Sequence, residues 1–382
     1  MKARVEITAA DAICLELLVE EGVFVQRIMY QHNNYPDSSN ILSLIVMPFL
    51  ALIEHDSVPY LEERFGFQLP KESSDLARIR HKTKSIDSRC LNYRKYSEEA
   101  SAIIKSNRDN FRKKGVARLM PSFLVKDIGI SYFDGEPIYS TFSVANFLND
   151  QNESLWNNSK EYCGSIGYSA GSTCAFHYCL AEQLIKDGRA FESPEFIVTA
   201  NDYTYTSLID NGMNGQTNDE CAFFFLSDQL FRLSSIEALR KGGFLEKTLW
   251  LKLATVYLFH AYRAIESFVA FMHKPSQGLF YSSDFLSRCC NIFSRDEKKK
   301  LKKMKKLRNA FVHYDFEPLI DYSLLGSRDY AFLLNAVLES RMEMTFIQYE
   351  SFLSALISKA ITSLKVITGF PTYSPRRNVF KS

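Results

Sequence analysis

Apolar residues recur at steps of three and four along most of this chain, the spacing that gives an α-helix one buried face. In the first part of the sequence, the segments AADAICLELLVEEGVFVQRIMYQ and EEASAIIKSNRDNFRKKG carry this pattern. The longest apolar run, Ile41–Ile53, contains Pro48 and has 13 residues, fewer than the roughly 20 that a helix needs to span a bilayer. We therefore predict a mainly helical region over residues 1–118 that does not cross a membrane.

The pattern changes between residues 119 and 220. FLVKDIGISYF and EFIVTAND contain β-branched and aromatic residues between turn residues, which is typical of strands, and CAFFFLSD is a candidate for a further strand. STCAFHYCLAEQLIKDG lies between the first two and predicts a helix that ends at Gly188. This region is therefore predicted to be α/β or α+β.

Helical spacing returns at about residue 221. It predicts helices over about 227–241, 246–273, 283–293 and 329–368, and another that begins at Ser294. The segment SRDE, Ser294–Glu297, has the form of a capping box, in which a serine and a glutamate three residues later each bond the other's backbone amide. About four or five long helices with short connections predict a helical bundle over residues 221–382.

The composition limits the classes of protein to which the chain can belong. Its 382 residues, 46% of them hydrophobic, suffice for an α-rich multidomain protein with real cores. The formal net charge is +2, so any nucleic-acid surface must be a local basic patch. The eight cysteines show no zinc-ligand spacing and no phosphate-binding glycine motif occurs, so we expect reduced thiols, no metal and no nucleotide cofactor. The N-terminus has acidic residues where a signal peptide needs an apolar core, which favours a cytoplasmic protein.

One stretch, KKLRNAFVHYDF at Lys305–Phe316, carries candidate chemistry. Its apolar spacing predicts a helix with one buried face. Seven lysines lie on the other faces: Lys298, Lys299, Lys300, Lys302, Lys303, Lys305 and Lys306. Asn309 and His313 are four residues apart and share one face, whereas Arg308 lies about 140° around the helix from His313. Because an arginine side chain is long enough to bend over that angle, the three residues can converge on one phosphate.

These residue types fit RNA cleavage. A histidine can transfer a proton near neutral pH, and an arginine can bind a phosphate oxygen and offset the charge that develops on it. The 2′-hydroxyl of RNA supplies the nucleophile, so no metal is required. Four lysines are the candidate contacts to the RNA backbone: Lys302, Lys303, Lys305 and Lys306. The alternative from spacing alone is a solvated, charged helix with a surface histidine.

The segment LRNAFVH resembles the signature of the HEPN family of helical-bundle ribonucleases. That signature is an arginine, four to six residues and a histidine, usually with a polar residue directly after the arginine. Arg308, Asn309 and His313 match it with a gap of four residues. The setting is also similar, since the motif lies on a late helix of a predicted bundle and follows a long apolar helix. The resemblance covers about residues 225–370.

The resemblance extends to the earlier helix. Family members often carry an acidic residue there, and YRAIESFVAF offers Glu266, with Arg263 and His260 along the same side. A purely structural pair of Glu266 with Arg263 is the alternative.

The resemblance implies a metal-independent endoribonuclease whose products end in 2′,3′-cyclic phosphates. His313 would be the base or acid, Arg308 would bind the phosphate and Asn309 would position it. It also implies a homodimer in which two Arg/His pairs face each other across one composite site. Many members are toxins or antiviral effectors, so residues 1–220 would sense, regulate or bind a partner, such as an antitoxin. Some HEPN domains only bind RNA or protein, and a non-catalytic dimerisation protein is therefore the second hypothesis.

Two other motifs lie in the middle region. GYSAG, Gly167–Gly171, matches the nucleophile elbow and would make Ser169 the nucleophile of a serine hydrolase, but NNSKEYCGSI before it is too polar for the strand that an elbow requires. STCAFHYCLAEQLIKDG, FIVTAND and DECAFFFLSD resemble part of the core of thiolase-fold ketosynthases. The family's nucleophilic cysteine aligns with Gly171, three residues before Cys174, and its second half has no room here. That likeness implies at most a degenerate fold reused for sensing or binding.

Overall fold

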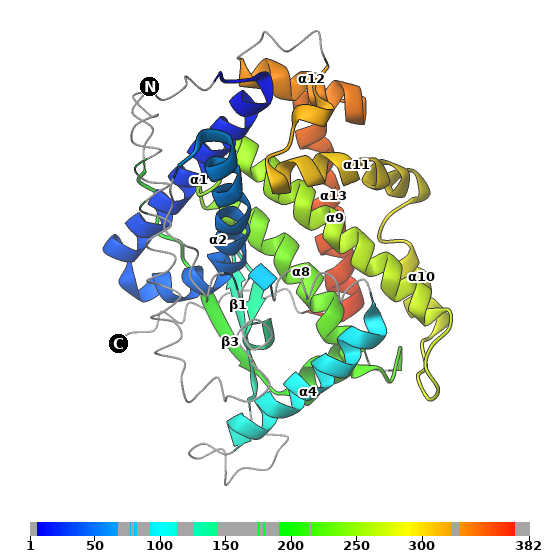
Figure 1. The fold of residues 1–382 in the computed structure, drawn as a ribbon. Helices are drawn as coiled ribbons and strands as arrows, with labels where there is room; N and C mark the ends of the chain where they lie inside the picture. The colour runs from blue at the N-terminus through cyan, green and yellow to red at the C-terminus, as the bar shows by residue number, and fades with distance from the viewer. Residues whose placement is uncertain are drawn as a thin grey trace.

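The computed structural model describes residues 6–67, 77, 80–81, 92–112, 126–143, 175, 179, 191–213, 215–321 and 329–370. Over these residues the chain is rich in helix and contains one small sheet (Figure 1). The α-rich class predicted from the sequence is therefore confirmed.

The first two predicted helical segments form helices of the N-terminal region. Its long helices are α1 (Ala9–Asn34), α2 (Pro36–Phe65) and α4 (Tyr93–Arg112). Helix α1 begins with a capping box, in which Thr8 and Asp11 each accept a hydrogen bond from the other's backbone amide. The sequence therefore located α1 and α4 correctly.

Helix α2 continues through Pro48 and Pro59, although each proline removes an amide donor. It therefore extends well beyond the 13-residue apolar run. Among the described residues, two helical segments are apolar enough, by length and composition alone, to cross a membrane: Ile41–Phe65 of α2 and Phe346–Thr368. The protein buries 61% and 39% of their most apolar windows, and the core helix of a soluble protein meets the same criterion.

A small antiparallel sheet, with strand order β2-β1-β3, lies in the middle region. Its strands are β1 (Ile128–Phe133), β2 (Glu136–Ser140) and β3 (Thr199–Tyr203). The β1–β2 hairpin turns at Asp134 and Gly135, both of which have positive φ, as an Asp-Gly turn allows. The two predicted strands correspond to β1 and to part of β3, whereas β2 was not predicted.

The segment CAFFFLSD is the first part of α8 (Glu220–Lys241), so the prediction of a strand there was wrong. Asp219 caps this helix by accepting a hydrogen bond from the amide of Cys221. The aromatic run is buried because α8 packs against β2, α9 and α13. A helix that is covered on several sides has no amphipathic period, and the pattern that would separate it from a strand is lost.

A short helix, α7 (Tyr205–Met213), precedes α8. The α-helices after α8 in the described residues are α9 (Lys247–Met272), α10 (Ser283–Cys290), α11 (Arg295–His313), α12 (Tyr330–Met342) and α13 (Phe346–Thr368), with a 3₁₀ helix at Glu317–Leu319. The capping box predicted at Ser294 and Glu297 is present at the start of α11. The single helix predicted over 329–368 is two helices, because Glu343 between them has a left-handed backbone (φ 59°).

The N-terminal helices share the hydrophobic core of the C-terminal helices. Buried apolar residues form one cluster that extends from Ala9 to Phe370. Helix α1 packs on α9 and α12, α2 on α11, and α4 on α8 and α9 (Figure 1). The predicted boundary near residue 118 lies outside the described residues, and the one near 220 falls at the N-cap of α8. The predicted regions 1–118, 119–220 and 221–382 thus contribute to a common core.

Candidate active site

Helices α9 and α11 pack against each other in opposite directions. Three side-chain contacts define their register: Glu266 to Lys298 at 2.9 Å, His260 to Arg308 at 2.5 Å, and Lys252 to the hydroxyl of Tyr314 at 2.7 Å. In these three contacts the residue number on α9 decreases while the number of its partner on or just after α11 increases. This register decides which residues of α9 reach the motif on α11.

The Arg308 guanidinium is held between the two helices. Its Nη2 lies 2.5 Å from Nε2 of His260, and its Nη1 donates to Oδ1 of Asn309 at 3.0 Å. Arginine has only donors, so Nε2 of His260 is the acceptor and this ring carries its proton on Nδ1. Arg308 is half-buried and Asn309 is exposed. Arg308 therefore contacts Asn309 and His260.

His313 is the last residue of α11, and its side chain is 52% exposed. Its Nδ1 lies 3.4 Å from Oδ1 of Asp56 on α2. Asp56 is buried and is fixed by an ion pair with buried Arg80 at 2.9 Å. A carboxylate beside one ring nitrogen of a histidine sets which nitrogen carries the proton, and it leaves the other nitrogen for chemistry. The 3.4 Å distance is long for a hydrogen bond.

Arg308 and His313 are thus held by different neighbours, α9 for the arginine and α2 for the histidine. Glu266 is not brought to Arg308. It pairs with Lys298, which lies ten residues before Arg308 and therefore about 15 Å away along α11. The antiparallel register places His260, six residues earlier on α9, opposite Arg308 instead. The structural alternative, a pair of Glu266 with Arg263, is likewise not the ion pair observed, since Glu266 pairs with Lys298.

Tyr314, the residue after His313, is part of a fully buried polar cluster. Tyr314 ends α11 with a left-handed backbone (φ 51°), and its hydroxyl donates to the carboxylate of Glu21 on α1. The ammonium of Lys252 donates to both the Glu21 carboxylate and the Tyr314 hydroxyl, each at 2.7 Å. Burial and the nearby Glu21 carboxylate raise the pKa of Tyr314 well above its usual value, so it remains a donor. This cluster fixes the backbone that follows His313.

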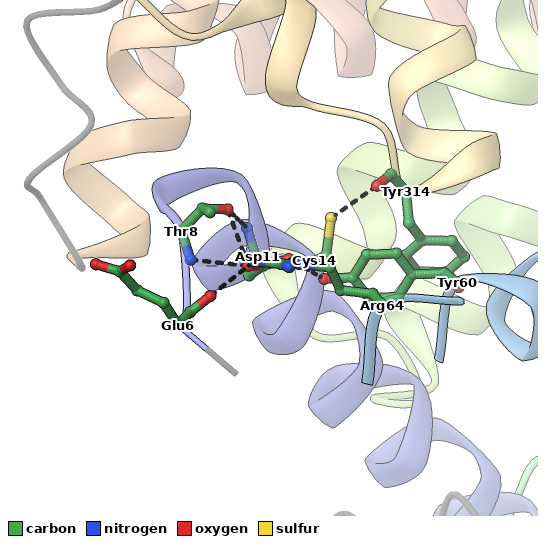
Figure 2. A network of polar contacts seen from close by, with 7 residues as sticks. All are labelled: Glu6, Thr8, Asp11, Cys14, Tyr60, Arg64 and Tyr314. Carbon is green, nitrogen blue, oxygen red and sulfur yellow. Dashed lines mark hydrogen bonds and ion pairs between the residues drawn. The ribbon is translucent and has the colours of Figure 1, made fainter. Parts of the chain in front are cut away.

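A second network holds the N-terminal helices against the same turn. In Figure 2 the rings of Tyr60 and Tyr314 stack, and the Cys14 thiol donates to the backbone carbonyl of Tyr314 at 3.1 Å. Asp11 accepts hydrogen bonds from the Tyr60 hydroxyl and from Arg64. Burial alone would raise the pKa of Asp11, but these bonds and those from Thr8 outweigh it and lower the pKa to about 2. Asp11 is therefore ionised at neutral pH.

The four lysines predicted to contact RNA are all exposed, but their surroundings differ. Lys303 pairs with Glu343 of the segment between α12 and α13 at 2.8 Å. In the part of the chain that the structure describes, Lys302, Lys305 and Lys306 form no ion pair. Their positive charge is consequently available to an external anion.

Two contributors to the site, Asp56 and Arg80, were missed by the sequence reading. Both come from the N-terminal region, and neither belongs to a recognisable motif, so only the packing of α2 on α11 reveals them. His260 was noticed only as a neighbour of Glu266 on α9. No group of three or more histidine, cysteine, aspartate or glutamate side chains suited to a metal ion occurs among the described residues.

The motifs of the middle region lie only partly within the described residues. Ser169, Gly171 and Cys174 lie outside the described residues. Of the segments that resemble thiolase-fold ketosynthases, FIVTAND contributes to β3 and DECAFFFLSD forms the start of α8. No family model, curated protein or solved structure matches the chain. The likeness of LRNAFVH to HEPN ribonucleases therefore rests on the motif and its place in the helices.

Proposed function

We propose that this protein is a metal-independent endoribonuclease of HEPN type, acting in the cytoplasm as a toxin or antiviral effector. The observation that carries the proposal is the presence of two separately supported side chains, Arg308 and His313, in the last part of α11. Arg308 is anchored by His260 and Asn309, and His313 stands exposed beside the buried carboxylate of Asp56. A phosphate binder and a proton-transfer group near one helix end are what RNA cleavage requires.

In the proposed reaction, the 2′-oxygen of RNA attacks the adjacent phosphorus, and the bond from phosphorus to the 5′-oxygen breaks. His313 takes the proton from the 2′-hydroxyl or gives one to the departing 5′-oxygen. Arg308 binds the non-bridging phosphate oxygens and offsets their growing negative charge. The products end in a 2′,3′-cyclic phosphate and a 5′-hydroxyl. In the homodimer that the family resemblance implies, the second protomer's motif supplies the other proton-transfer group.

In this proposal the N-terminal region contributes residues to the site and its support, which a separate sensor domain would not do. Helix α2 supplies Asp56, and helix α1 supplies Glu21 of the cluster beneath His313. A partner that binds residues 1–220, whether an antitoxin or an activating ligand, can therefore alter the site by moving these helices.

Incubation of purified protein with total RNA in excess chelator tests the proposal. Wild type is expected to cleave, whereas His313→Ala and Arg308→Ala are expected to be inactive. Lys299→Ala serves as the matched control, since Lys299 lies on the same helix and pairs with Asp296 at 3.1 Å, far from the motif. Full cleavage by both motif variants would refute the site assignment.

The second hypothesis, a non-catalytic protein that dimerises and binds RNA or protein, has one observation in its favour. Arg308 and His313 are held by different helices, so their convergence requires Arg308 to reorient. RNA binding that weakens steeply with salt, without any product under activating conditions, would favour this reading. A serine hydrolase acting through Ser169 is tested by labelling with a fluorophosphonate, and the absence of an adduct would exclude it.

A further inference from the structure

The exposed side of α11 carries a straight row of polar side chains that ends at His313. The row consists of Lys302, Lys306, Asn309 and His313, at steps of four, three and four residues. At about 100° per residue, these steps keep all four positions within roughly 60° of one another around the helix axis. All four residues are exposed. We call this set the α11 row.

The lysines of α11 differ in whether a carboxylate neutralises them. Lys298 pairs with Glu266 and Lys303 pairs with Glu343, so a carboxylate offsets the charge of each. The two lysines of the row, Lys302 and Lys306, have no ion-pair partner among the residues that the structure describes. These two exposed, uncompensated charges lie on the same side of α11 as His313.

Acidic residues lie beyond both ends of the row. Asp296 and Glu297, which pair with Lys299 and Lys359, lie in the first turn of α11, and exposed Asp315 lies two residues after His313. The row from Lys302 to His313 spans eleven residue steps, or about 16 Å. A polyanion that follows the row is attracted over this length.

We propose that the α11 row binds the phosphates of a single-stranded RNA and leads that strand to His313. This inference rests on the proposed ribonuclease function and adds the substrate class to it. A single line of cations follows one line of phosphates, whereas a duplex presents two such lines across a groove. The length of the row corresponds to on the order of three nucleotides of extended backbone on one side of the cleaved bond. Arg308, on the side of α11 that faces α9, then binds the phosphate that lies next to His313.

Binding is measured with a fluorescent, ten-nucleotide 2′-O-methyl RNA, which has no free 2′-hydroxyl and is not cleaved. Anisotropy titrations at several salt concentrations compare wild type with Lys302→Gln/Lys306→Gln. Since each phosphate contact to a single strand contributes about 0.7 to the slope of log Kd against log salt, the double variant is expected to lower that slope by about 1.4. Lys303→Gln is the matched control, because Lys303 is an exposed lysine of the same helix that already has a partner.

The outcomes separate this inference from the proposed function. A lower slope for Lys302→Gln/Lys306→Gln, an unchanged slope for Lys303→Gln, and weaker binding of the corresponding duplex support the row as a single-strand track. Equal slopes for all three proteins, equal binding of duplex, or no binding by wild type would overturn it. Cleavage of unmodified RNA by wild type, and its loss in His313→Ala, tests the ribonuclease independently. Cleavage with equal slopes would defeat the row alone, and binding with the expected slopes but no cleavage would defeat the ribonuclease alone.

Discussion

Replacing Lys252 by Met should destabilise the protein strongly. The side chains of Lys252 and Glu21 are both 0% exposed and lie 2.7 Å apart, and the ammonium also rests over the Tyr314 ring at 4.0 Å. Methionine fills a similar volume but leaves the Glu21 carboxylate as an uncompensated buried charge, which costs about 3–5 kcal/mol. That loss is a large part of the 5–15 kcal/mol typical of a whole protein. For a chain of 382 residues, it corresponds to a fall of about 4–6 °C in Tm.

Urea denaturation followed by circular dichroism measures this effect. Glu21→Gln/Lys252→Met, which removes both charges, should recover more than half of the loss, because no ion is then left in the core. Lys303→Met is the control on a surface pair with Glu343 and should leave the unfolding midpoint unchanged. If Lys252→Met unfolds within about 1 kcal/mol of wild type, or if the double variant is no more stable than the single one, the reasoning about a coupled buried pair is wrong.

Three further predictions concern the site and the helix junctions. Asp56→Asn should slow RNA cleavage by about 10-fold or more, because the His313 ring loses its carboxylate, and unchanged rates in a folded variant would contradict this. His260→Leu should weaken binding of 2′-O-methyl RNA, whereas His260→Gln, whose amide oxygen can still accept from Arg308, should retain it; equal loss in both would contradict the accepting role. Burial raises the pKa of Glu20 from 4.5 to about 7, so the folded state binds this proton more tightly than the unfolded state, and stability falls as the pH rises from 4.5 to 7. Glu20→Gln should remove this slope and exceed wild type in stability by up to about 3 kcal/mol at pH 8, as measured by urea unfolding at a series of pH values.

The sequence predicted those features that depend on local periodicity. Helix α11 was located to the residue at its start, because the Ser294–Glu297 capping box is a short-range signal. The break at Glu343 was missed, since the apolar spacing continues across it and a left-handed residue other than glycine or asparagine gives no warning. The strand predicted in CAFFFLSD failed because its aromatic residues are buried on several sides of α8.

Only part of the candidate site could be predicted from the sequence, because local periodicity does not show which distant residues support it. Arg308, Asn309 and His313 are close in sequence, and helical geometry relates them. Their supporting groups are distant in the chain: Asp56 is 257 positions before His313, and His260 is 48 positions before Arg308. The choice between His260 and Glu266 depends on the register of α9 against α11, which no pattern within either helix specifies. Tertiary packing alone decides such pairs.

Because α1 packs in the core against later parts of the chain, its contacts can form only after those parts have been synthesised. Glu21 finds its partners Lys252 and Tyr314 only after more than 230 further residues have been synthesised. Asp56 likewise waits for His313, near the end of α11. Contacts of such large sequence separation form late in folding. A nascent chain on the ribosome therefore cannot complete the site until Tyr314 has been synthesised. Under the proposed function, this delay keeps an RNA-cutting protein inactive beside the messenger and ribosomal RNA during that part of its own synthesis.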